Sequence, residues 1–167
     1  MAANLPTSAA PAADPNAPEL QLQNIYIKDA SFEAPNGPNL PAAEWSPQFG
    51  MNMAAAGTTV AENIHEVVLT ITLEAKVGER VAYLVEVKQA GMFTLRNYSV
   101  DDARRIIGGF CPGVLFPYAR QAVADLIMRG GFPPFLLPPV NFDALFQQSL
   151  EQAAAQQQPA PAQSTVN

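Results

Sequence analysis

The sequence predicts an α+β fold in which a four-stranded antiparallel sheet comes first and is followed by helices packed on one face. Apolar and polar residues alternate with a period of two over much of residues 20–94, as in strands. The spacing becomes helical after Ser99, and most of the 16 prolines lie before Pro47 or after Phe132. Strands followed by helices, rather than alternating with them, favour an antiparallel sheet.

The chain has 167 residues, enough for one domain. Residues 1–18 are rich in Ala and Pro, and residues 153–167 are rich in Ala, Gln and Pro. Neither segment has the apolar periodicity that would offset the entropy lost on ordering. We therefore expect a folded domain over 19–152 between two disordered segments.

Four strands are expected, one after another. Their expected ranges are 20–34, 48–60, 64–76 and 80–94. In the first, Ile25 and Ile27 alternate with polar neighbours, and the Asn36-Gly37 pair predicts the turn that ends it. Gly78 predicts a tight hairpin between the third and fourth strands, because glycine adopts the backbone angles that such turns require.

Helices follow the strands. Ser99 and Asp102 have the spacing of a capping box, which predicts a helix start. We expect Cys111-Pro112 to interrupt this helix and a second helix to run to Gly130-Gly131. Asn141 then predicts the cap of a last helix. With helices on one face, the other face is expected to carry Ile25, Ile27, Leu84 and several acids, and to favour oligomerisation.

The formal net charge of −6 disfavours nucleic-acid binding, which needs basic residues to neutralise phosphates. A basic partner fits this charge, and so does simple solubility. The start of the chain does not have the pattern of a signal peptide, and no apolar run is long enough for a membrane helix. The single cysteine also fits a reducing compartment, so we expect a cytoplasmic protein without membrane insertion.

Candidates for chemistry are few. His65 is the only histidine and has no nucleophile or carboxylate orienter nearby in sequence, so we interpret it as structural. Cys111 is interpreted as a buried thiol rather than a reactive one. One cysteine and one histidine cannot form a zinc site, and no phosphate-binding loop is present. We expect no catalytic residues, metal or cofactor.

Two surface patterns each have two possible interpretations. Asp29 and Glu33 share one face of their strand, and Glu86 can join them, as a solvated face or as a docking surface for a basic segment. Trp45, Phe146 and the apolar run 132–137 are either ordinary core or a surface that receives extended polypeptide.

Four blocks of sequence carry a family resemblance. They are Ile25–Asn36, Tyr83–Phe93, Cys111–Arg120 and Pro139–Phe146. In this order they resemble the SecB family of protein-export chaperones. The resemblance implies a homotetramer, built as a dimer of dimers, that binds unfolded precursor proteins, keeps them competent for translocation without using ATP, and delivers them to the SecA ATPase.

The resemblance also implies roles for individual residues. Positions used for SecA binding match Asp29, Glu33, Leu84 and Glu86. Positions associated with the tetramer interface match Val85, Val87 and Gln89. Trp45 and Phe146 match aromatic positions of the client groove. The alternatives are a toxin–antitoxin-associated SecB-like chaperone with dedicated clients, and a small α+β enzyme.

Overall fold

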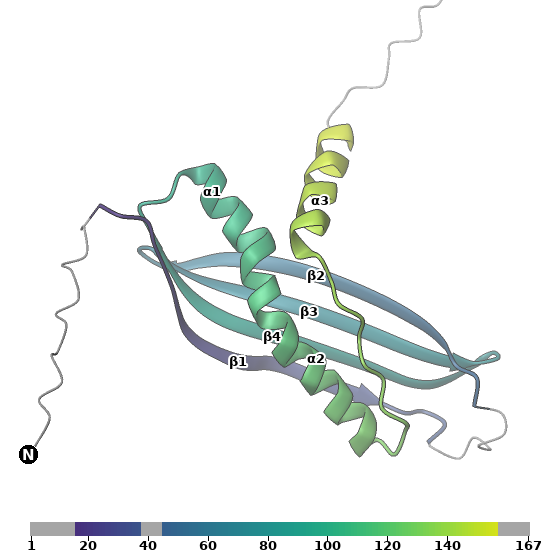
Figure 1. The fold of residues 1–167 in the computed structure, drawn as a ribbon. Helices are drawn as coiled ribbons and strands as arrows, with labels where there is room; N and C mark the ends of the chain where they lie inside the picture. Colours follow the sequence, from purple (N-terminus) through teal and green to yellow (C-terminus); the bar gives the residue numbers. More distant parts are fainter. Residues whose placement is uncertain (1–15, 38–44, 157–167) are drawn as a thin grey trace, which may run out of the picture.

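The computed structural model describes residues 16–37 and 45–156. Four strands form one antiparallel sheet in the order β1-β4-β3-β2. Their bounds are β1 Glu19–Glu33, β2 Gln48–Ala61, β3 Ile64–Val77 and β4 Arg80–Arg96. The expected α+β fold with helices on one face is confirmed (Figure 1).

The turns predicted at Gly37 and Gly78 are present, and a third turn lies at Asn63. Gly37 and Gly78 both have positive φ, 61° and 59°, at the turns after β1 and β3. Asn63 has a φ of 58° in the turn between β2 and β3, where its short polar side chain tolerates the left-handed region. The turns after β2 and β3 make β2, β3 and β4 a meander, and β1, which comes first in the chain, pairs with the other edge of β4.

The helices form a long rod and a separate terminal helix. The rod consists of α1 Val100–Arg105, the π-helical segment η2 Ile106–Phe110 and α2 Cys111–Arg129. Ser99 caps it, since the backbone N–H of Asp102 donates to Ser99 Oγ at 3.1 Å. The expected start of a second helix at Cys111-Pro112 is confirmed, with Pro112 in the first turn of α2, but the backbone stays helical across this boundary. The wide turn of η2, closed by the N–H of Cys111 donating to the carbonyl of Ile106, leads into α2 without a break.

A connection over residues 130–141 leads back across the same face of the sheet to α3, Phe142–Gln156 (Figure 1). Asn141 caps α3, because its Oδ1 accepts from the N–H of Ala144 at 3.0 Å. The helix includes residues 153–156, which we expected in the disordered tail, so that boundary is corrected. Residues 1–15 and 157–167, where disorder was predicted, lie outside the described residues.

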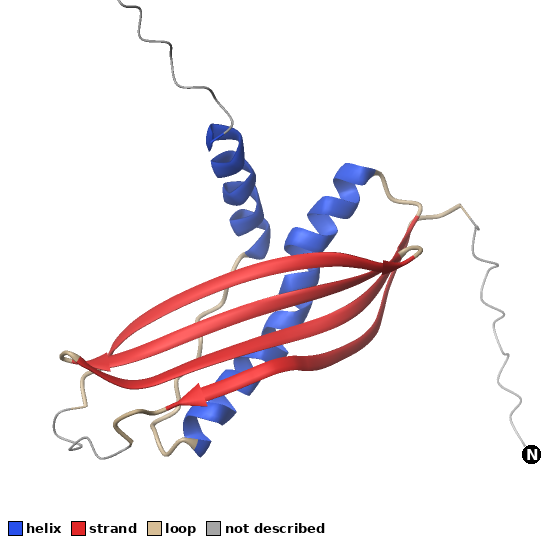
Figure 2. Cartoon of the chain, turned by 180° about the vertical axis from the view of Figure 1, so that it is seen from behind, coloured by secondary structure: helices blue, strands red, loops and turns tan. Residues whose placement is uncertain are grey.

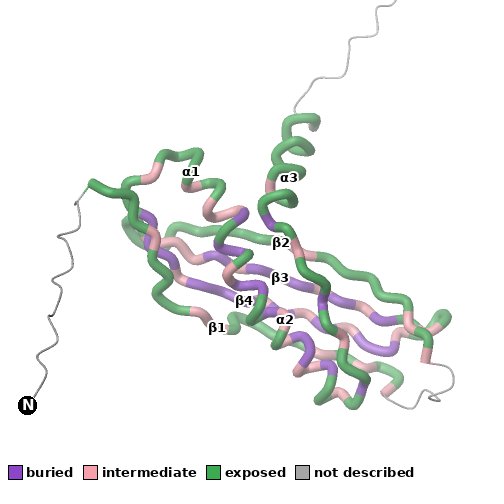
Figure 3. The backbone as a smooth tube through the Cα atoms, viewed as in Figure 1, coloured by how far each residue is buried: buried purple, intermediate pink, exposed green. Residues whose placement is uncertain are grey.

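The core lies between the rod and the two central strands (Figure 3). Fully buried side chains come from alternate positions of β3 and β4 and from one stripe of α2. They include Val67, Leu69, Ile71, Leu73, Val85, Val87, Leu115, Ala119, Val123 and Ile127. The edge strands β1 and β2 are largely exposed. Seen from behind, no helix of residues 16–37 and 45–156 lies on the opposite face of the sheet, and we call it the open face (Figure 2).

A β-bulge in β1 corrects one expectation. Ile27 pairs with Gln89 and Asp29 pairs with Lys88, so Lys28 is an extra residue in β1. This shift places Ile25 and Ile27 on the helix side of the sheet, while Asp29 lies on the open face. The buried amide of Gln89 donates to the carbonyl of Tyr26 at 2.8 Å, next to the irregular segment.

Candidate functional site

The open face brings the four residues of the predicted SecA site together. Glu33 pairs directly with Leu84, and two residues along the strands Ser31 pairs with Glu86. Paired residues of antiparallel strands lie on the same face, so the acids of β1 and β4 face the same way. We call Asp29, Glu33, Leu84 and Glu86 the acidic surface. The periodicity of each strand predicted this arrangement, and pairing of β1 with β4 completes it.

Lys88 lies inside the acidic surface, and sequence reasoning missed it. Its Nζ is 3.1 Å from Asp29 Oδ2 and 3.3 Å from Glu86 Oε1. Thr72 Oγ1 donates to the other oxygen of Glu86 at 3.1 Å. The hydrogen bond to Asp29, and to a smaller extent that to Glu86, raises the pKa of Lys88, so the ammonium stays charged. Its position in the sequence could have indicated this, because Lys88 follows Glu86 by two residues on one strand and therefore shares its face.

A second polar cluster lies farther along the open face. Glu66 on β3 accepts from the Tyr26 hydroxyl and from Lys28 Nζ, the latter at 2.6 Å. The hydrogen bond from Lys28, followed by that from Tyr26, holds the pKa of Glu66 below its usual value. The bulge at Lys28 turns its side chain toward Glu66, so this cluster ties the irregular part of β1 to the middle of the sheet.

The residues matched to tetramer assembly lie inside the subunit. Val85 and Val87 are fully buried and Gln89 is 3% exposed. All three face the helix side, because each pairs with a buried core residue of β3. They therefore make no direct surface for a second copy, and a role in assembly has to act through the position of α2 or of β1.

Trp45 lies in an aromatic cluster at one end of the helix side. Its ring centroid is 5.7 Å from that of Phe132, which is 5.0 Å from Tyr83 and 6.2 Å from Phe32. Trp45 is only partly buried. The cluster therefore combines a packed interior with an indole whose surface is partly exposed.

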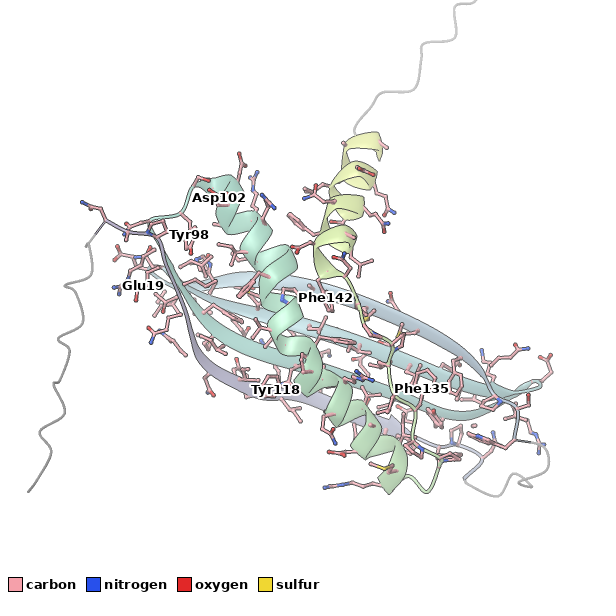
Figure 4. All side chains as sticks on the ribbon, viewed as in Figure 1. Glu19, Tyr98, Asp102, Tyr118, Phe135 and Phe142 are labelled. Carbon is pink, nitrogen blue, oxygen red and sulfur yellow. The ribbon has the colours of Figure 1, made fainter. Side chains whose placement is uncertain are left out.

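Phe146 lies in a second apolar site, a pocket of about 370 Å³ between α3 and the sheet. Its lining includes Met53, Leu69, Gly108, Phe142 and Phe146. Gly108 permits this close approach, since a Cβ at that position would fall 2.3 Å from the Phe146 ring. Figure 4 shows Phe142 where the connection enters α3 and Phe135 on the connection itself. Trp45 and Phe146 thus belong to different sites.

A stripe of apolar side chains on β2 runs from the Phe146 pocket, which Met53 lines, toward the end of the strand that follows Trp45. Phe49, Met51 and Met53 alternate along β2 and face the helix side, opposite Ala75, Leu73 and Ile71. Phe49 and Met51 are 41% and 42% exposed, and the ring of Phe49 lies 4.2 Å from that of Phe135. We call the Trp45 cluster, this stripe and the Phe146 pocket together the apolar groove.

The candidates for chemistry have structural environments. His65 is partly buried, with Nδ1 3.1 Å from Thr59 Oγ1. Cys111 is fully buried, and burial raises the pKa of its thiol to about 12, which disfavours a reactive thiolate. Among residues 16–37 and 45–156, no group of three or more His, Cys, Asp or Glu side chains is placed to hold a metal ion. No helix in those ranges is long and apolar enough to cross a membrane.

Comparison with known proteins identifies the family. The family described as SecB, preprotein translocase subunit SecB, matches residues 13–153. The protein-export protein SecB of Nitrosococcus oceani is 48% identical over 136 residues, which cover 80% of this chain and 83% of that protein. That of Methylococcus capsulatus is 45% identical over 145 residues, covering 86% and 94% of the two chains.

The chain belongs to the SecB family.

The SecB relationship makes the protein an export chaperone and disfavours the toxin–antitoxin alternative. A solved SecB-like chaperone of Mycobacterium tuberculosis, in complex with a peptide from the HigA1 antitoxin, shares the fold with a TM-score of 0.63. It is 16% identical, and the match covers 72% of this chain and 90% of that one. The export proteins are therefore far nearer in sequence than this neighbour.

Proposed function

We propose that this SecB family member holds unfolded precursor proteins in the apolar groove, without catalysis or ATP, and passes them to SecA in the cytoplasm. The half-exposed stripe on β2 is the observation that carries the proposal. Large apolar side chains on a solvent-exposed surface cost free energy unless another polypeptide covers them. Methionine adapts to irregular partners, so Met51 and Met53 suit clients of varied sequence.

The length of the groove indicates how a client binds. Leu69 on β3 lines the Phe146 pocket. Ala75, also on β3, pairs with Tyr83 of the Trp45 cluster. Six residues of strand separate Leu69 from Ala75, which corresponds to about 20 Å. An extended client of about six residues spans that distance. Several weak segments on one assembly then give strong holding by raising the effective concentration.

Two neighbouring substitutions on β2 test the groove. Met51→Asp places a carboxylate on the helix side of β2. Asn52→Asp places the same carboxylate one residue away, on the open face. We expect Met51→Asp to abolish the delay that excess chaperone imposes on refolding of a slow-folding precursor. Asn52→Asp should delay refolding as the native protein does. Equal holding by both variants would place the client elsewhere.

The acidic surface is proposed to dock SecA. Its carboxylates converge on the open face, where a basic segment of a partner can reach them. Asp29→Asn with Glu86→Gln should weaken SecA binding while client holding persists, measured by fluorescence anisotropy and by refolding delay. Equal loss of both activities would point to a misfolded subunit instead.

Assembly into a homotetramer, as a dimer of dimers, is proposed from unpartnered apolar surface. Ile27 on the edge strand β1 is 53% exposed, and Phe110 and Tyr118 on the rod are 51% and 53% exposed. Val85, Val87 and Gln89 support these surfaces from beneath, by positioning α2 and β1. Light scattering should give the mass of four chains of 17.8 kDa. A monomer at working concentration would contradict the proposal.

A further inference from the structure

Lys88 lies at one end of the acidic surface, beside Asp29 and Glu86. We propose that Lys88 is an internal counterion of this surface, which a docking cationic segment of SecA must displace, and that it thereby sets the affinity and the salt dependence of docking. The inference rests on the proposed function, since it assigns a specificity-determining role within that same surface.

The geometry gives Lys88 two carboxylates at once. Its Nζ lies 3.1 Å from Asp29 Oδ2 on β1 and 3.3 Å from Glu86 Oε1 on its own strand. The ammonium therefore contacts two of the three carboxylates of the acidic surface and offsets one of its three negative charges. Glu33 lies farther along β1, pairs with Leu84 and is exposed. A partner meets a surface that is less acidic than its carboxylates alone suggest.

Exposure makes the displacement feasible. The side chains of Lys88, Glu86 and Asp29 are 38%, 35% and 58% exposed, so solvent and a partner both reach them. Ion pairs of this kind contribute little to stability, because water screens them and long side chains lose rotamer freedom. A guanidinium or ammonium of SecA can take the place of Lys88 Nζ, and Lys88 then turns outward into water.

Competition also fixes the salt response. Every cation of SecA that pairs with Asp29 or Glu86 breaks an existing pair of the free chaperone. The net number of ion pairs gained on docking is therefore small in the native protein, and added salt weakens docking only moderately. Without Lys88 the same contacts would be net gains. Docking would then be tighter at low salt and more sensitive to salt.

Lys88→Gln tests this directly, with Arg96→Gln as the matched control. Arg96 lies on the same strand and face, pairs with Glu19 at 3.5 Å, and is eight residues from Lys88. That separation is about 26 Å along the strand, well beyond the Debye length at physiological salt. Both variants lose one positive charge, so the control removes the effect of net charge.

The measurement is the Kd of the full-length chaperone for purified SecA, by fluorescence anisotropy over salt concentrations from about 0.1 M upward, where the Debye length is about 10 Å or less and Arg96 is screened from the surface. Lys88→Gln should bind about two- to tenfold more tightly at low salt, with a steeper salt dependence. Lys88→Arg and Arg96→Gln should match the native protein within about twofold. A Lys88→Gln chaperone with native or weaker affinity, and a native salt slope, would overturn the inference.

Two further readings separate the possible failures. If the native chaperone and Lys88→Gln both fail to bind SecA, the proposed function falls and the inference falls with it. If Asp29→Asn with Glu86→Gln weakens docking but Lys88→Gln changes nothing, the proposed function stands and the inference is refuted. A purely structural Lys88 would lower the melting temperature of Lys88→Gln without changing the salt slope, which is also a refutation.

Discussion

Replacing Gly108 by alanine tests how closely α3 packs on the rod. A Cβ at this position would lie 2.3 Å and 2.4 Å from two ring carbons of Phe146. Carbon atoms in contact are normally about 3.5–4.0 Å apart, so the ring has to move by more than about 1 Å. Overpacking of this kind costs about 1–3 kcal/mol, and the helix gains about 1 kcal/mol when glycine becomes alanine. We expect a net destabilisation of about 0–2 kcal/mol.

Removing the ring should reverse the sign. In a Phe146→Ala background the clash is gone, so Gly108→Ala should stabilise the protein by about 1 kcal/mol through helix propensity alone. The coupling between the two substitutions is then about 1–3 kcal/mol. Gly50→Ala is the control, because a Cβ there meets nothing within 4 Å. Its effect should be neutral or slightly stabilising in both backgrounds.

The assay is urea unfolding of all variants at one protein concentration, because the stability of an assembly depends on concentration. If Gly108→Ala changes the free energy of unfolding equally with and without the Phe146 ring, within about 0.5 kcal/mol, the contact between α3 and the rod is not the one described.

Three other predictions concern side chains that are buried or partly buried. Burial raises the pKa of both Cys111 and Tyr83 to about 12, above their ordinary values of 9.0 and 10.0. The unfolded chain therefore loses these protons first, and stability is full below pH 9 and falls as pH rises toward 12. Urea unfolding should show a loss on the order of 3–4 kcal/mol between pH 8 and 11, smaller in Cys111→Ala, and a flat profile would contradict the burial. Val87→Ala should lower the free energy of unfolding by about 1–3 kcal/mol and weaken assembly in parallel, measured by light scattering; lost assembly with unchanged stability would require a direct contact. His65→Ala should delay precursor refolding as the native protein does, whereas loss of holding would revive a role for the imidazole.

The sequence by itself determined the elements and their order. Alternation of apolar residues along β3 and β4 is a local property, so both strands were placed within a few residues. Caps at Ser99 and Asn141 and the glycine turn at Gly78 also act over a few residues. The family resemblance came from contiguous blocks, and the family match confirmed it. The predicted roles of the acidic surface and of the groove stay predictions.

Tertiary structure alone decided which residues meet. The bulge at Lys28 shifted Ile25 and Ile27 to the helix side, because one extra residue reverses every side chain beyond it. Pairing of β1 with β4, far apart in sequence, brought Lys88 to Asp29. The rod continues through the π-helical segment η2 into α2, although Pro112 lies in the first turn of α2. The connection to α3 brings the Phe146 ring into contact with Gly108. Periodicity within one segment tells which side chains share a face, but only pairing between segments tells what lies opposite them.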